Sequence, residues 1–209
     1  MIPSAHEPDD ESLARRAREG DSPSFEALVI RHHHRLVRYA AQRLRDTHAA
    51  EDVAQAAFVS AWKALHQWNP ERPFLPWLFA VCRSRLIDHV RRAPPPGVDA
   101  ESESAHDATP ARDYAAGEDA RGLWAWMRGQ LSERQHTALW LHYQENFSVA
   151  EAAAAMRLTV THVKVLLHRA RATLARELAG HPEWRGCLAA LATRSSTFSV
   201  RITEGRQPS

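Results

Sequence analysis

The sequence predicts an all-α fold in which two small helical domains, the second a helix-turn-helix, are joined by a flexible acidic linker. Apolar residues recur at helical spacing on both sides of one Pro-, Ser- and acid-rich stretch, and the alternation expected of strands is scarce. Of the 209 residues, 44% are hydrophobic, which is enough for packed cores. The expected division is a first helical domain over 11–93, a linker over 94–119, a helix-turn-helix domain over 120–180 and a tail over 181–209.

The first expected helix is short and covers residues 11–20. Gly20 and Asp21 are typical of a helix stop and a turn, after which Ser22 or Ser24 can cap the next helix. That second helix carries an apolar stripe that we expect to enter the core, and its members are Phe25, Leu28, Val29, Leu36, Val37, Ala40 and Leu44.

Residues 49–92 form the stretch around which the chain is organised. Pro70 and Pro73 divide it into two helical patterns, because proline lacks an amide donor and disfavours α geometry in the residue before it. The first pattern has the spacing of a helix with one buried stripe, made of Val53, Ala57, Phe58, Ala61, Trp62 and Leu65.

Aromatic side chains crowd the break between these patterns, and a basic helix follows them. The aromatics are Trp68, Phe74 and Trp77. Cations neutralise phosphates and rings stack on bases, so this combination is typical of a surface that binds single-stranded nucleic acid or a base extruded from a duplex. The alternative is that the aromatics form the core of a helical domain and the arginines a solvated face.

Two motifs favour the nucleic-acid interpretation. AEDVAQAAFVSAW and FLPWLFAVCRSRLIDHVRR resemble the second region of bacterial sigma factors, in particular those of the short extracytoplasmic-function class. Ala56 stands where that family usually has an acid, and Ser84 where it usually has Asn near the extruded promoter base. The matching residues are Ala50, Glu51, Asp52, Gln55, Phe58, Trp62, Phe74, Trp77, Leu78, Asp88, Arg91 and Arg92.

The resemblance implies that the first domain docks on the clamp of RNA polymerase and melts and reads the −10 promoter element. The residues that it implies for polymerase binding are Asp52, Gln55, Phe58 and Trp62. The residues that it implies for contact with −10 DNA are Trp68, Asn69, Phe74, Trp77, Ser84, Arg85, Asp88, Arg91 and Arg92.

The charge of the chain is segregated. Residues 21–96 hold 11 Lys and Arg against 7 Asp and Glu, and residues 121–178 hold 8 against 4, whereas residues 97–120 hold 1 against 7. The middle segment cannot bury enough apolar surface to offset its ordering entropy, so we expect a flexible linker that avoids nucleic acid. In the sigma family this connector threads through polymerase toward the RNA exit path; a solubilising spacer is the alternative.

The second block has helix-turn-helix order, with a short helix, a tight turn at residues 156–158 and a long basic helix from about Thr161. Ser132 with Gln135 and Ser148 with Glu151 both fit the capping-box pattern at helix starts. The apolar residues expected to face inward from the long helix are Val163, Leu166, Leu167, Ala170 and Leu174.

Residues 131–174 resemble the fourth region of sigma factors, which binds the −35 element while seated on the polymerase flap. Arg157 replaces the turn glycine of that family, which costs about 1 kcal/mol where the backbone needs a positive φ. Val165 and Leu166 replace Ser and Arg, so the expected recognition helix is less polar than usual. The residues implied for −35 DNA are Lys164, Val165, His168, Arg169 and Arg171.

The rest of the sequence excludes several other classes. It contains no phosphate-cradling loop, paired acids or activated nucleophile, so we expect neither an enzyme nor a cofactor. The run His32-His33-His34 cannot close on one metal ion, because consecutive helical residues point about 100° apart. No apolar run approaches the roughly 18 residues that a membrane span needs, and the start resembles no signal peptide. The cytoplasm is the expected compartment.

Together the two motif sets imply a dissociable initiation subunit of bacterial RNA polymerase. The expected partners are the polymerase core through its β and β′ subunits, promoter DNA and an anti-sigma factor. Two alternatives remain: a helix-turn-helix regulator that acts without polymerase, and an interaction protein that has kept the fold and lost promoter recognition. For the tail over residues 181–209 there are two interpretations. It forms a short helix, which packs back on the protein or binds a regulator, or it is a frayed end.

Overall fold

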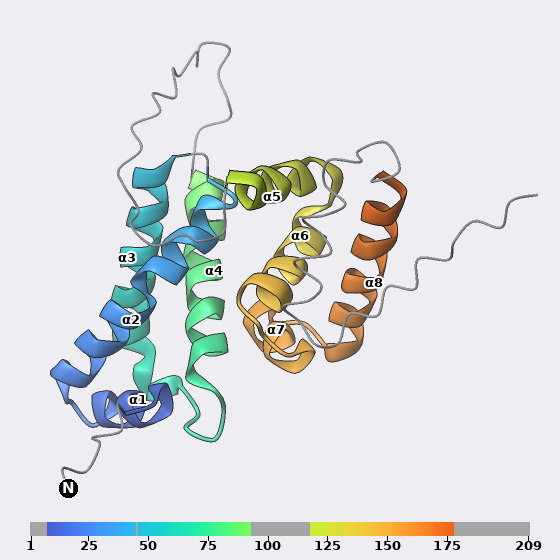
Figure 1. The fold of residues 1–209 in the computed structure, drawn as a ribbon. Helices are drawn as coiled ribbons and strands as arrows, with labels where there is room; N and C mark the ends of the chain where they lie inside the picture. The colour runs from blue at the N-terminus through green and yellow to red at the C-terminus, as the bar shows by residue number, and fades with distance from the viewer. Residues whose placement is uncertain (1–7, 45, 93–117, 178–209) are drawn as a thin grey trace, which may run out of the picture. The chain divides into compact units, whose positions relative to one another are not determined.

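The structure, a computed structural model, describes residues 8–44, 46–92 and 118–177 (Figure 1). Most of these residues are helical, and no strand occurs in the described ranges, which confirms the predicted all-α class. The predictions for the tail and for the linker up to residue 117 lie outside the described residues. Because a helix already begins at Glu118, the predicted linker end at residue 119 is two residues too late.

The chain divides into two units, each described here by itself. The first comprises residues 1–114 and 148–164, and the second comprises residues 115–147 and 165–209. The helix-turn-helix boundary at 120–180 therefore stays a prediction.

Residues 148–164 add α7 (Val149–Met156) to the first unit, and its N-terminal part is built on four helices. They are α1 (Asp10–Arg18), α2 (Ser22–Ala41), α3 (Thr47–Ala64) and α4 (Phe74–Arg92), with a 3-10 turn η1 (Leu65–Gln67) after α3. Helix α3 packs against both α2 and α4, and α1 packs against α2 (Figure 1). The core side chains include Leu28, Leu36, Phe58, Leu78 and Phe79. Burying each contributes about 1.5–3 kcal/mol, so the amphipathic stripes hold the bundle together.

The stripe predicted in α3 is buried except at one residue. Val53, Ala57 and Phe58 are at most 5% exposed, whereas Trp62 is 39% exposed. The turn before α2 also differs from expectation. Gly20 adopts φ +101°, as the predicted stop requires, but Asp21 rather than a serine stands at the N-cap position. Ser24 instead donates its hydroxyl to the Asp21 carboxylate at 2.6 Å.

The second unit holds α5 (Glu118–Gln130), α6 (Glu133–Leu139), a π-helical turn η2 (Trp140–Gln144) and most of α8 (Val160–Glu177). Its core is aromatic. The ring of Trp124 lies 4.8 Å from that of Trp140 and 5.5 Å from that of His136, both edge-on. The Trp140 indole donates to the buried Glu145 carboxylate at 3.2 Å.

Both predicted capping boxes are confirmed. Ser132 accepts from the Gln135 amide, and the Gln135 side chain accepts from the Ser132 amide at 2.9 Å. Ser148 and Glu151 make the same reciprocal pair, at 3.1 and 2.8 Å, at the start of α7 (Val149–Met156). These side chains satisfy amides that the first turn of a helix leaves without partners, so the sequence determines where α6 and α7 begin.

The tight turn predicted after α7 is also confirmed. Arg157 adopts φ 53° and ψ 46°, the left-handed conformation in which the family usually has glycine. The amides of Arg157 and Leu158 donate back to Ala154 and Ala153 at 3.1 and 2.9 Å, closing the helix end. Helix α8 starts at Val160, one residue before the expected position, and Thr159 caps it by accepting from the His162 amide at 3.2 Å.

Replacing Arg157 with glycine should stabilise the protein. Arg157 is exposed and pays the steric cost of a left-handed backbone, about 1 kcal/mol, which glycine avoids. In urea unfolding we expect Arg157→Gly to raise the free energy of unfolding by about that amount, and Arg157→Ala to give no gain. Equal stability of the glycine and alanine variants would contradict this.

Acid should destabilise the second unit through His136. Burial first, and then the charge of Arg128, lowers the pKa of His136 from 6.5 to about 4. Between these values the unfolded chain binds a proton that the folded chain does not, so this contribution to stability is complete above pH 6.5 and is lost as the pH falls toward 4. The loss should reach about 2–3 kcal/mol in urea unfolding at pH 4. His136→Gln should flatten this slope, whereas the exposed His162→Gln should keep it.

Candidate docking groove and nucleic-acid interface

A groove of about 650 Å³ runs between α2 and α3. Aromatic rings line it: Phe25 lies 4.9 Å from Trp62 and 6.4 Å from Phe58, and His33 stacks at 6.3 Å from Phe58. The residues that line the groove are Phe25, Val29 and His33 from α2 and Glu51, Asp52, Gln55, Phe58, Val59 and Trp62 from α3.

The groove has an apolar floor and an acidic rim. Val59 and Trp62 are 50% and 39% exposed, which is unusual for side chains of that size. Glu51 and Asp52 are exposed at the end of the groove nearer the start of α3. An apolar surface beside two carboxylates is suited to a partner with an apolar stripe and flanking cations.

All four residues that the sequence implied for polymerase binding line this one groove. Asp52, Gln55, Phe58 and Trp62 share a face of α3 because they recur at helical spacing. The sequence analysis named none of the other five lining residues for this role. These are Glu51 and Val59 in α3, and Phe25, Val29 and His33 in α2, of which Phe25 and Val29 were assigned to the core. The available signal for the three α2 residues was their spacing of four residues, which places them along one edge of the α2 stripe.

The loop between α3 and α4 corrects two of the predicted −10 contacts. Trp68 is 1% exposed and Phe74 is fully buried, and their rings meet edge-on at 5.6 Å. The interpretation of these two rings as base-stacking platforms is therefore wrong for this structure; they are core. Asn69 remains exposed, and its side chain accepts from the Glu71 amide at 3.0 Å to shape the turn.

Four of the other predicted −10 residues follow one line along α4. Trp77, Ser84, Asp88 and Arg91 lie within about 60° of one another at 100° per residue, on the side opposite the buried Leu78, Cys82 and Leu86. Trp77 is half-buried and contacts Phe74 at 5.6 Å, while Arg91 and Arg92 are exposed at the end of the helix. Arg85 pairs with Asp88 at 3.6 Å. A partly exposed tryptophan and cations thus share a helix, and their contact with DNA stays a prediction.

Helix α1 holds the α3–α4 loop in place. Glu11 accepts from the amide of Phe74, the first residue of α4, at 3.1 Å, and Arg15 donates to the Pro70 carbonyl at 3.1 Å. A carboxylate at the start of a helix also complements the helix dipole. The residues with which α4 begins are therefore fixed by a helix more than 50 positions earlier in the chain.

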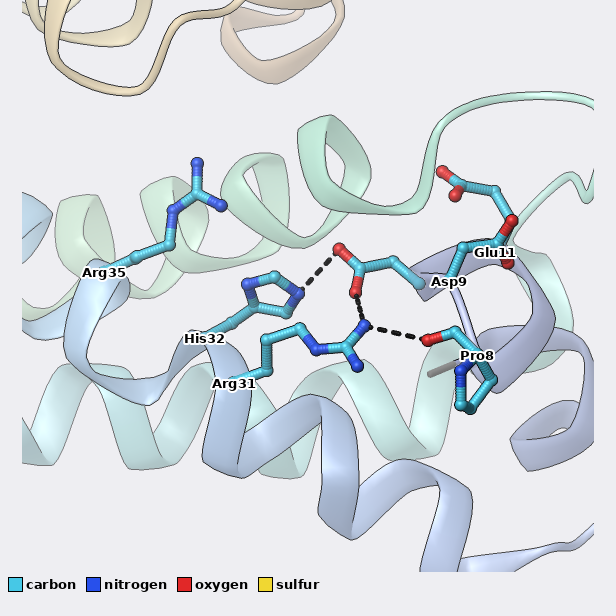
Figure 2. A pocket seen from close by; sticks show the side chains of 7 residues that line it. Pro8, Asp9, Glu11, Arg31, His32 and Arg35 are labelled. Carbon is cyan, nitrogen blue, oxygen red and sulfur yellow. Dashed lines mark hydrogen bonds and ion pairs between the residues drawn. The ribbon is translucent and has the colours of Figure 1, made fainter. Parts of the chain in front are cut away.

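A second set of contacts ties α1 to α2 (Figure 2). The Asp10 carboxylate lies 2.7 Å from Nη1 of Arg31 and 2.8 Å from Nε2 of the buried His32. Arg31 also donates to the Pro8 carbonyl at 3.1 Å. Partial burial opposes ionisation of Asp10, but His32 and Arg31 outweigh it and lower the pKa of its carboxyl. His32, one of the three consecutive histidines, is thus a structural residue that anchors α1.

The exposed face of α8 holds four of the five residues predicted for −35 DNA. Lys164, Val165, His168 and Arg169 are exposed. The fifth, Arg171, is half-buried; its Nε donates to the Tyr143 hydroxyl at 3.0 Å, and its guanidinium lies 5.7 Å from the Tyr143 ring centre. Burial raises the pKa of Tyr143, against the opposing effect of Arg171. Arg171 therefore orients α8 within its own unit, and its contact with DNA stays a prediction.

Comparison with known families matches both halves of the chain. The family model for Sigma-70 region 2 matches residues 28–94, and that for Sigma-70 region 4 matches residues 129–174. The chain is a sigma factor of the sigma-70 family, in its extracytoplasmic-function class. The first match covers most of the groove and all of α4, and the second covers α6, α7 and most of α8.

Curated relatives align with this sigma factor over most of their length. The RNA polymerase sigma-H factor of Pseudomonas aeruginosa is 28% identical over 184 residues, 81% of this chain and 93% of that protein. The ECF RNA polymerase sigma-E factor of Escherichia coli is 27% identical, over 78% and 90%.

Among solved structures, CnrH in complex with the cytosolic domain of CnrY superposes with a TM-score of 0.63, at 28% identity over 82% of this chain and 98% of that chain. RpoE of Bartonella quintana, solved in complex with the anti-sigma factor NepR, shares the fold at a TM-score of 0.56 and 21% identity, over 74% of this chain and 96% of that chain. Within the described ranges, no helix of this sigma factor is long and apolar enough to cross a membrane.

Removing the Glu11 carboxylate should loosen the start of α4. The Phe74 amide would lose its acceptor, so Glu11→Ala should cost about 1 kcal/mol of stability and raise hydrogen exchange at the Phe74 amide. Glu19→Ala, at an exposed position just after α1, is the matched control and should change neither. Unaltered exchange at Phe74 in Glu11→Ala would show that this carboxylate does not hold the loop.

Proposed function

We propose that this sigma factor joins core RNA polymerase through the α2–α3 groove and opens promoters with the loop and outer face of α4. The observation that carries the proposal is the gathering of Asp52, Gln55, Phe58 and Trp62 in one groove, within a segment that matches region 2. The groove partner is a helical element of the β′ clamp with an apolar stripe and basic flanks. The second domain sits on the β flap.

The −10 element is bound by α4 after the duplex opens. Arg91 and Arg92 neutralise phosphates, since both are exposed cations at the end of a helix. Trp77 supplies the stacking surface, because Trp68 and Phe74 are buried. Asn69 lies exposed in the rigid loop that Glu11 and Arg15 hold, and it contacts a base extruded from the stack.

The −35 element is a duplex and is bound by α8 in the major groove. Lys164 and Arg169 meet phosphates, while Val165 and His168 face base edges. Because the −10 and −35 elements are bound by two separate domains, core polymerase is needed to hold α4 and α8 at the distance between these two elements.

An anti-sigma factor is the expected regulator. Two solved relatives are described as complexes, one with the cytosolic domain of CnrY and one with the anti-sigma factor NepR. A protein that covers the apolar α2–α3 groove would compete with polymerase for the same residues. Because its partners are polymerase and the chromosome, the protein works in the cytoplasm, without inserting into the membrane itself.

Transcription in vitro with variants of the full chain tests this assignment. Trp62→Ala should weaken core binding about 30-fold, as loss of a central interface tryptophan does, and reduce run-off transcription accordingly. Trp77→Ala and Arg91→Ala should retain core binding but lower promoter opening about tenfold. Specific start sites from a promoter library would identify the promoter directly.

Two matched variants serve as controls. Lys63→Ala neighbours Trp62 but does not line the groove, and Arg18→Ala removes an exposed cation from α1; both should bind and transcribe normally. Salt-dependent duplex binding by the free chain, without any effect of core, would favour a stand-alone regulator. Core binding without transcription from any template would favour an interaction protein.

A further inference from the structure

The exposed face of α8 has an apolar centre. Val165 is 40% exposed, and at 100° per residue it points away from the buried stripe of Val163, Leu167 and Ala170. Thr161 and His168 lie about one turn to either side of Val165 and on the same face, and all three are exposed. A valine in the middle of a surface that meets nucleic acid is unusual, because such surfaces are normally polar and basic.

Cations flank this centre on both sides. Lys164 and Arg169 lie about 140° apart around the helix axis, on either side of the line through Thr161, Val165 and His168. A helix in the major groove has a sugar-phosphate backbone on each side and base edges in front. The flanking cations therefore fit the phosphates, and Val165 lies between them with Thr161 and His168, as the apolar member of the three side chains that face the bases.

The chemistry of Val165 restricts which base it can face. The major-groove edges of guanine, cytosine and adenine present donors and acceptors, and an isopropyl group against them would desolvate these atoms without replacing a hydrogen bond. Thymine alone carries an apolar group there, its C5 methyl. Contact between Val165 and that methyl buries apolar surface on both partners.

We propose that Val165 is a specificity-determining residue that selects a thymine in the −35 element by contact with its 5-methyl group. The proposal rests on the function proposed above, since it requires that α8 lie in the major groove of that element. Thr161 and His168 on either side place this thymine in the interior of the segment that α8 reads, rather than at its edge.

Replacement of thymine by deoxyuridine removes only the methyl group and so tests the contact directly. Holoenzyme assembled from core polymerase and the full chain would first select −35 sequences from a randomised duplex library. Each thymine of the selected element would then be replaced singly by deoxyuridine. We expect one replacement to weaken promoter binding about fourfold, the factor expected for one buried methyl group. Val165→Ala should weaken binding to the thymine promoter and make it insensitive to that replacement.

Val160→Ala is the matched control. Val160 is a similarly exposed valine in the same helix, 42% against 40%, but it points about 140° away from Val165. It should retain the full deoxyuridine effect, and all variants should melt as the wild type does because the altered side chains are exposed. A selected element without thymine, or one in which no replacement alters binding by the wild type, overturns the inference alone. Failure of the holoenzyme to select any promoter overturns the proposed function, and this inference with it.

Discussion

The edge-on contact between Trp68 and Phe74 determines how the first domain is built. These two buried rings close the break that the prolines open between α3 and α4, and Glu11 and Arg15 reinforce it from α1. Because the break is rigid, the direction in which α4 leaves the loop is fixed, and with it the positions of Trp77 and Arg91. A flexible break would spread these residues over many positions and raise the entropy lost on binding DNA. Trp68 and Phe74, which the sequence analysis assigned to contact with bases, instead hold the loop and so fix the positions of Trp77 and Arg91.

One face of helix α3 packs into the core, and the neighbouring face lines the groove. Ala50, Val53, Ala54, Ala57 and Ala61 are small or compact and let α2 and α4 approach closely. Phe58 lies at the boundary and contributes to both, so the groove floor is continuous with the core and inherits its rigidity. Val59 and Trp62 remain 50% and 39% exposed in the folded domain, so a partner that covered them would bury further apolar surface. A partner could therefore occupy the groove without a large rearrangement of the backbone.

Sequence analysis located the helices well because their signals are local. The capping boxes at Ser132 and Ser148 and the turn at Arg157 depend on residues a few positions apart, and all three lie where the sequence predicts. Burial of Trp68 and Phe74 depends on α1, more than 50 residues earlier, and no periodic pattern reports that contact. Phe25, Val29 and His33 depend on tertiary packing in the same way. Their spacing places them at the edge of an apolar stripe, but the packing of α2 on α3 decides that they line a groove. Similarly, the family motif implies that Arg171 contacts DNA, whereas in the structure its Nε donates to the Tyr143 hydroxyl.

In the proposed mode of DNA binding, α4 and α8 each combine cations that meet phosphates with an uncharged side chain between them. In α4 the exposed cations stand at the helix end, and in α8 they stand at the sides, while the residues between them differ in kind: a tryptophan in α4 and a valine in α8. A ring can stack on any base, so it favours opened DNA with little regard to sequence. A valine makes no hydrogen bond, so it discriminates only where the opposing edge is apolar. Phosphate contacts add a similar affinity at every site, so they do not contribute to the difference in affinity between two promoters. Under the proposed mode of binding, it is therefore the valine of α8, rather than the cations or the tryptophan of α4, that discriminates between promoters.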